Sequence, residues 1–110
     1  MDRLKDKVAL ITGAAQGIGL GIAAVFAQEG SRVVLADTKQ KEGEDAAGRI
    51  CRDGGIALFS PTDVAQEEDV RRAVTTTVAE FGRLDIVVNN AGVCVVKGID
   101  ECTSAEWDQV

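Results

Sequence analysis

The sequence predicts an α/β domain built on a doubly wound parallel sheet. Short apolar runs begin near residues 8, 32, 56 and 85, and stretches with helical spacing lie between them. Glycines follow the helical stretches, at positions where helices commonly end. This alternation of strands and helices favours right-handed crossovers between parallel strands, and the expected strand order is 3-2-1-4.

The first strand and the first helix are separated by a glycine-rich turn. Residues 8–11 are apolar and mostly branched, as in a strand that is buried on both faces. Four residues then recur at helical spacing and predict one apolar helix face: Ile18, Ile22, Val25 and Phe26. Glu29 and Gly30 are expected to end this helix.

The second and third strands enclose a weaker helical pattern. Residues 32–36 have the composition of a buried strand that ends in Asp37, and residues 56–59 predict the third strand. Pro61 suits a sheet edge, because proline cannot donate to the hydrogen-bond ladder. The helix expected over residues 39–53 contains two glycines, which weaken it. Its predicted inner face is Gly43, Ala46, Ala47 and Ile50.

One more helix and strand are expected after the third strand. The helix Glu67–Phe81 starts with an acidic turn and is followed by Gly82. Residues 85–88 predict a fourth strand that lacks the lysine, proline or bulge that protects a sheet edge, and a loop is expected after it. A capping box at residues 103–106 predicts a further helix. More sheet is therefore expected to follow, and the chain is interpreted as the truncated front part of a larger domain.

Composition argues against several classes of function. The net charge of −6 disfavours a nucleic-acid partner, which requires clustered Lys and Arg. No apolar run reaches the roughly 18 residues of a membrane span, and the polar start is unlike a secretory signal. The three cysteines are expected as reduced thiols in a cytoplasmic protein. The chain has no histidine, the commonest zinc ligand and general base, and no metal site is expected.

Gly13, Gly17 and Gly19 mark the candidate ligand site. Glycine at a strand end allows a tight turn, and glycines at a helix start let backbone amides approach a ligand. The first N–H groups of a helix lack intrahelical partners and lie at the positive end of the helix dipole, so a pyrophosphate is their usual ligand. The alternative is that these glycines serve packing alone.

Asp37 is the residue expected to select the cofactor. It ends the second strand about 20 residues beyond the turn, where a carboxylate accepts hydrogen bonds from the adenosine ribose of NAD and repels the 2′-phosphate of NADP. Lys39 weakens this preference slightly, while Gln16 leaves the turn uncharged. The alternative role of Asp37 is a solvated turn residue or a helix cap.

Asp63 and Val64 follow the third strand at the same rim of the sheet. The Asp63 carboxylate would accept a hydrogen bond from the adenine amino group, and Val64 would supply an apolar contact and a backbone N–H. An equally good alternative is that Asp63 caps the next helix, with Gln66 completing a capping box.

Asn89-Asn90-Ala91-Gly92 follow the fourth strand. Asparagine side chains can hold neighbouring loops, and small residues let the backbone approach a ribose and a nicotinamide. Four motifs occur in one order along the chain: T-G-A-A-Q-G-I-G at residues 12–19, Asp37, Asp63-Val64 and N-N-A-G. Together they resemble the short-chain dehydrogenase/reductase family, in its compact single-domain branch, over the whole chain.

The resemblance implies an NAD-binding Rossmann-type domain over residues 1–110. The implied pyrophosphate cradle is Gly13, Gln16, Gly17, Ile18 and Gly19. Asp37 would bind the adenosine ribose, and Asp63 and Val64 would flank the adenine. The implied lining on the ribose side of the cofactor is Asn90, Ala91 and Gly92. Asn89 would steady the sheet, and the Thr12 hydroxyl would orient the turn.

The catalytic groups of this family are missing from the 110 residues. Members transfer a hydride with a serine, an asparagine and a Tyr-x-x-x-Lys pair, in which the lysine lowers the tyrosine pKa. The chain contains no tyrosine, so no catalytic residue is assigned and the chain alone is predicted to be inactive.

Two functions remain open. The chain is either the cofactor-binding part of an NAD-dependent oxidoreductase acting on a small alcohol or carbonyl compound, or a non-catalytic NAD-binding or interaction module. A methyltransferase or sugar-nucleotide epimerase is disfavoured by the glycine spacing and by N-N-A-G. The resemblance also makes a homo-oligomer an expectation, which the sequence does not specify further.

Overall fold

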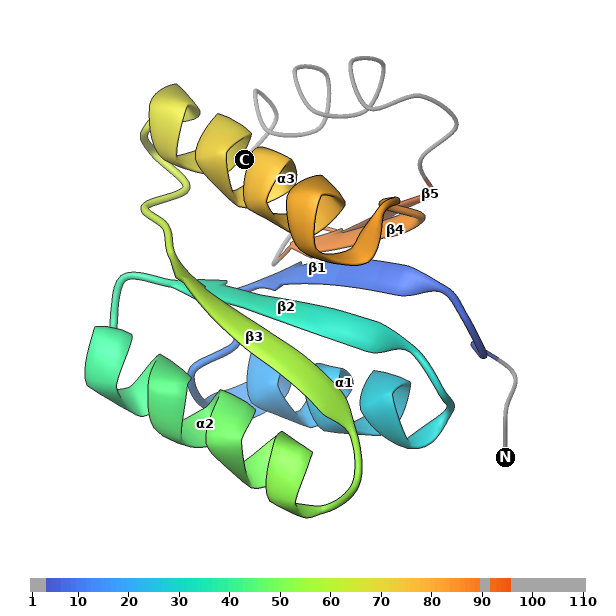
Figure 1. Cartoon of the computed structure of the whole chain (residues 1–110). Helices are drawn as coiled ribbons and strands as arrows, with labels where there is room; N and C mark the ends of the chain where they lie inside the picture. Colours follow the sequence, from blue (N-terminus) through green and yellow to red (C-terminus); the bar gives the residue numbers. More distant parts are fainter. Residues whose placement is uncertain (1–3, 90–91, 96–110) are drawn as a thin grey trace.

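A computed structural model describes residues 4–89 and 92–95 (Figure 1). Its centre is a five-stranded sheet with the order β3-β2-β1-β4-β5. The strands are β1 (Val8–Thr12), β2 (Arg32–Asp37), β3 (Ile56–Pro61), β4 (Ile86–Asn89) and β5 (Gly92–Val95). The first four strands are parallel, which confirms the predicted order 3-2-1-4.

Three helices cover the two faces of the sheet. α1 (Gly17–Gln28) and α2 (Gln40–Arg52) lie on one face, and α3 (Glu67–Phe81) lies on the other (Figure 1). The chain winds outward from β1 to β3 by two crossovers on one face, and it returns to the far side of β1 across the other face. This arrangement is the predicted doubly wound fold. Within residues 4–89 and 92–95, no helix has the length and apolar character needed to cross a bilayer.

β5 replaces the loop that was expected after the fourth strand. Gly92–Val95 pairs antiparallel with β4, and Asn89 lies opposite Gly92. Only residues 90–91 connect the two strands, and so short a connection permits antiparallel pairing alone. In this structure β4 is therefore an inner strand. The helix expected from residues 103–106 lies outside the described residues.

The buried face of α1 differs from the apolar face that the periodicity predicts. Ile18 and Val25 are 85% and 55% exposed, whereas the buried residues of this helix are Gly19 and Ala23. Only part of the predicted face, including Ile22, packs against the core. Small residues let the helix backbone approach the sheet closely, so the size of the side chains decides which face turns inward.

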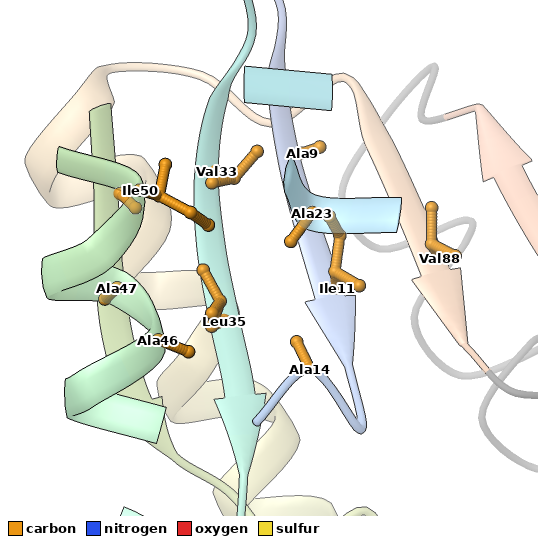
Figure 2. Close-up of a cluster of buried hydrophobic side chains, with 11 residues drawn as sticks. Ala9, Ile11, Ala14, Ala23, Val33, Leu35, Ala46, Ala47, Ile50 and Val88 are labelled. Carbon is orange, nitrogen blue, oxygen red and sulfur yellow. The ribbon is translucent and has the colours of Figure 1, made fainter. Parts of the chain in front are cut away.

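Small and branched side chains fill the core between the sheet and its first two helices (Figure 2). α2 buries the four residues predicted for its inner face: Gly43, Ala46, Ala47 and Ile50. Gly43 lies so close to Phe59 that a side-chain carbon at this position would overlap the aromatic ring. Alternate strand residues complete this core layer: Ala9, Ile11, Val33, Leu35, Ala57 and Val88.

The intervening strand residues point to the opposite face, where α3 packs. The buried side chains of this second layer include Leu10, Val34, Ala36, Ala73, Val74 and Val87. Gly82 ends α3 with a φ of +80°, as its position in the sequence predicts. All five residues of β1 are buried, so this strand lies between two complete layers of the core.

Asp85 ties the amino ends of β1 and β4 together. Its carboxylate accepts a hydrogen bond from the Val8 N–H at 2.9 Å, and its own N–H donates to the Val8 carbonyl at 2.9 Å. The Arg83 guanidinium donates to the second carboxylate oxygen at 2.7 and 3.1 Å. Burial opposes ionisation most strongly, but Arg83, the Val8 N–H and the charge of Lys7 outweigh it. The pKa of Asp85 is therefore lowered from its ordinary value of 3.8.

Replacing Asp85 with Asn is expected to reduce the free energy of unfolding by about 1 kcal/mol at neutral pH, because charge-assisted hydrogen bonds are lost. A carboxyl group whose pKa is lower in the folded than in the unfolded state stabilises the fold above the unfolded pKa. That contribution is lost as the pH falls through the folded pKa. Urea unfolding should thus show the difference between Asp85→Asn and the parent shrinking below about pH 4.

The control for this prediction is Asp45→Asn, which changes an exposed acid on α2. This variant should follow the parent at every pH. A stability difference for Asp85→Asn that stays constant from neutral to acidic pH would contradict the assigned role of the Asp85 carboxylate.

Candidate functional site

The glycine turn lies at the carboxyl end of β1, where α1 begins. Gly13 and Gly17 have φ values of +63° and +66°, a region that residues with side chains rarely adopt. At Gly19 a side-chain carbon would overlap the carbonyl oxygen of Gly13, so this glycine lets α1 start directly against the turn. At Gly17 no atom of the described residues, apart from its chain neighbours and the nearby backbone of its own helix, lies within 4 Å of the corresponding position. Gly19 thus serves packing, whereas Gly17 presents its backbone to open space.

The first turn of α1 supplies no acidic side chain of its own. The N-cap of this helix, Gln16, makes no capping hydrogen bond. α2 has Glu42 in its first turn, and α3 has three acidic residues there. The first amides of α1 thus have no acidic partner from their own turn, an arrangement that favours an anion at a helix start.

Asp37 lies directly against the glycine turn. Its Oδ2 accepts a hydrogen bond from the Ala15 N–H at 3.1 Å, although the two residues are 22 positions apart. Its Oδ1 accepts one from the Lys39 N–H at 3.0 Å, so Asp37 also closes a local turn. It does not cap α2, whose N-cap residue is Lys39. Each carboxylate oxygen has a further lone pair with which it can accept a ligand hydroxyl.

Asp63 and Val64 lie beyond β3, at the same rim. The Asp63 Oδ1 accepts a hydrogen bond from the Ala65 N–H at 2.9 Å, and Val64 is 39% exposed. α3 has Gln66 as its N-cap, so the alternative that Asp63 caps this helix is wrong. Asp63 instead closes the turn before the helix. Its Oδ2 has no hydrogen-bond partner among the described residues.

Two further side chains at this rim were not expected from the sequence. The Asp69 Oδ2 accepts a hydrogen bond from the Asp63 N–H at 2.9 Å. Arg72 donates to the Asp69 Oδ1 at 2.9 Å and to the Pro61 carbonyl at 3.3 Å. The Asp63 N–H is the main cause that lowers the pKa of Asp69; partial burial opposes it and Arg72 supports it. In the sequence Asp69 looks like any acid of a first helical turn, and no signal distinguishes it.

A hollow of about 330 Å³ lies between the start of α1 and the ends of β1 and β4. Its lining residues are Thr12, Ile18, Gly19, Ile22, Val88 and Asn89. The strand order reverses between β1 and β4: α1 follows β1 on one face of the sheet, and α3 precedes β4 on the other. Ligands of such sheets bind at this kind of switch point. The Thr12 hydroxyl, expected to orient the turn, is buried and donates to the Val88 carbonyl at 3.4 Å, which joins β1 to β4.

The remaining predicted residues are placed only in part. Asn90 and Ala91 lie outside the described residues, and Gly92 opens β5. A second hollow, of about 270 Å³, lies between the carboxyl halves of α1 and α2 and includes Gln28 and Asp53. It contains none of the predicted site residues. The glycine turn, Asp37 and the pair Asp63-Val64 instead gather at the carboxyl ends of the parallel strands.

Known proteins of similar sequence were found over the whole chain. The family model described as short chain dehydrogenase matches residues 7–110. Cyclopentanol dehydrogenase of Comamonas testosteroni is 42% identical over 110 residues, which are 100% of this chain and 44% of that protein. Tropinone reductase-like 1 of Erythroxylum coca is 45% identical over 97 residues, 88% of this chain and 35% of that protein. The chain thus spans less than half the length of these curated relatives.

Two solved structures share the fold. A 7α-hydroxysteroid dehydrogenase complexed with NADH and 7-oxo glycochenodeoxycholic acid has a TM-score of 0.77 and 34% identity, covering 79% of this chain and 34% of that one. The 3-ketoacyl-(acyl-carrier-protein) reductase of Brucella melitensis, complexed with NADH, has a TM-score of 0.71 and 42% identity, covering 76% and 33%. With the strand order, the glycine turn and the family match in agreement, the chain belongs to the short-chain dehydrogenase family.

Proposed function

We propose that this chain supplies the NAD-binding part of an oxidoreductase that transfers a hydride between NAD(H) and an alcohol or carbonyl substrate. The observation that carries the proposal is the 3.1 Å hydrogen bond between the Asp37 carboxylate and the Ala15 N–H of the glycine turn. In a dinucleotide the adenosine ribose is bonded directly to the pyrophosphate, so a ribose acceptor and a phosphate turn must be adjacent. Relatives named as dehydrogenases and reductases support the reaction class.

The residues at this rim fit a dinucleotide. The open space at Gly17 and the lack of an acid in the first turn of α1 suit a pyrophosphate. Asp63 and the exposed Val64 suit an adenine, and the hollow beside Thr12 suits the nicotinamide end. Asn90, Ala91 and Gly92 are proposed to line the cofactor on that side. The bound nicotinamide would supply the hydride chemistry, and the chain's own residues would bind and orient it.

Asp37 is proposed to favour NAD over NADP. Its carboxylate would repel a 2′-phosphate, and phosphate-binding sites for NADP use a basic side chain. Lys39 contributes its backbone N–H to Asp37, and the exposed Gln16 is uncharged. The two solved relatives described above were complexed with NADH, in agreement with this preference.

A non-catalytic NAD-binding module is the alternative function, and it concerns these 110 residues by themselves. The sequence contains no tyrosine, so these 110 residues cannot assemble the Tyr-x-x-x-Lys pair that the family resemblance implies for proton exchange. Both functions share the same cofactor site, and they differ in whether substrate is turned over.

Replacing Asp37 with Ala is expected to weaken NADH binding about tenfold, because the ribose hydroxyls lose their acceptor. NADPH should bind as well as before or better, so the ratio of the two affinities should fall. Calorimetric titration with both cofactors measures this ratio, which a simple loss of stability would not change. Asp53→Ala, beside the second hollow, is the control, and equal ratios in all three proteins would refute the assigned role of Asp37.

Replacing Gly17 with Val is expected to abolish NADH binding. The side chain would occupy the open space where the backbone meets the phosphates, and the positive φ would be strained. Gly21→Val is the matched control, since Gly21 also faces open space but lies further along α1 with no positive φ. Micromolar NADH affinity in Gly17→Val, measured by NADH fluorescence, would count against the phosphate cradle.

The purified 110-residue protein is expected to bind NADH without reducing NAD⁺ when cyclopentanol or another alcohol is supplied. The reason is the missing tyrosine, which leaves no group to exchange the hydroxyl proton. Absorbance of NADH formed over time measures turnover, and cofactor titration of the same preparation shows that the site is intact. Turnover above the protein-free background would overturn the view that this chain lacks the catalytic relay.

A further inference from the structure

Two side chains of α3 hold the loop that joins β3 to this helix. The backbone offers a donor at Asp63, in this loop, and an acceptor at Pro61, the last residue of β3; Thr62 lies between them. Asp69 accepts from the first at 2.9 Å, and Arg72 donates to the second at 3.3 Å. The two side chains are themselves paired at 2.9 Å. A single ion pair therefore binds both backbone groups and ties the loop at Asp63 to the end of β3.

The other groups around Asp63 are engaged as well. Its Oδ1 accepts from the Ala65 N–H at 2.9 Å, and its carbonyl accepts from the Gln66 N–H at 2.9 Å. The Thr62 N–H donates to the Asp37 carbonyl at 2.9 Å, which fixes the start of the loop to β2. With its backbone N–H, its carbonyl and one carboxylate oxygen all held, Asp63 has Oδ2 left as an acceptor for a ligand.

We propose that Asp69 and Arg72 are positioning residues, which hold the Asp63 carboxylate where it accepts a hydrogen bond from the amino group of the adenine. The inference rests on the proposed function and extends it to two residues that do not touch the cofactor. An acceptor that is restrained before the ligand arrives loses less conformational entropy on binding, so the restraint increases the gain from the adenine contact.

A second ion pair on the same helix provides the comparison. Glu67 and Arg71 are also 2.9 Å apart, but their side chains are 68% and 64% exposed, and Glu67 bonds along the helix rather than to the loop. The Asp69 side chain is only 26% exposed. Both acids lie in the first turn of α3, where a negative charge interacts favourably with the helix dipole. Removing Glu67 therefore affects only the stability of the helix, whereas removing Asp69 also releases the loop. Comparing the two variants separates these effects.

The test compares NADH with nicotinamide hypoxanthine dinucleotide in its reduced form, which lacks the adenine amino group. The parent protein is expected to prefer NADH by about tenfold, the value of one hydrogen bond to a charged acceptor. In Asp69→Ala this preference should fall to less than about threefold, and Arg72→Ala should lie between the two. Asp69→Asn keeps an oxygen for the Asp63 N–H and should retain most of the preference. Glu67→Ala should keep all of it.

Each outcome decides between the claims. A preference that collapses in Asp69→Ala and persists in Glu67→Ala and Asp69→Asn supports the positioning role, because a merely structural loss would lower both affinities equally. An unchanged preference in folded Asp69→Ala, or no preference in a parent that binds NADH, overturns the inference and leaves the proposed function standing. A parent that binds neither dinucleotide overturns both. Circular dichroism verifies that each variant is folded. If Asp69→Ala does not fold, the decision rests on Asp69→Asn. Loss of the NADH preference in folded Asp69→Asn would also overturn the inference.

Discussion

The complete burial of β1 is the constraint on which the rest of the structure depends. Its five residues lie between two core layers, and the strand pairs with β2 on one side and β4 on the other. Of the β1 side chains only Thr12, at the end of the strand, lines a hollow, so a ligand can approach this strand only where it ends. There the chain must turn sharply into α1. Gly13 and Gly19 allow that turn to lie flat against the helix, which brings unpaired amides to the carboxyl rim.

The acids at this rim are organised by backbone amides rather than by basic side chains alone. Asp37 accepts from Ala15 and Lys39, and Asp63 accepts from Ala65, all at 2.9 to 3.1 Å. Such contacts hold each carboxylate in one orientation while leaving further lone pairs for hydroxyl or amino groups of a ligand. The chain's own contacts therefore shape the rim, and its acceptors suit the dinucleotide proposed above.

The sequence was sufficient for those elements whose inner face is decided by hydrophobicity. The inner face of α2 and the span of α3 are as expected, since their apolar and polar residues separate clearly at helical spacing. The face of α1 was not predictable in this way, because Ile18 and Val25 have the right period but Gly19 and Ala23 have the right size. β5 was missed because its pairing follows from a two-residue connection to β4 rather than from a strong strand pattern.

In the candidate site too, some residues could be predicted from local sequence patterns, whereas others depend on tertiary contacts. Its glycines and Asp37 follow from local spacing, because a strand, a turn and a helix must succeed one another within a short stretch. Asp69 could not be recognised, since Glu67 and Asp69 share the same turn and the same charge. Only the packing of α3 against β3 turns Asp69 toward the loop and leaves Glu67 bonded along the helix. These two acids thus differ in the direction of their hydrogen-bond donors. That direction is determined by the folded structure and cannot be read from the composition of the helix.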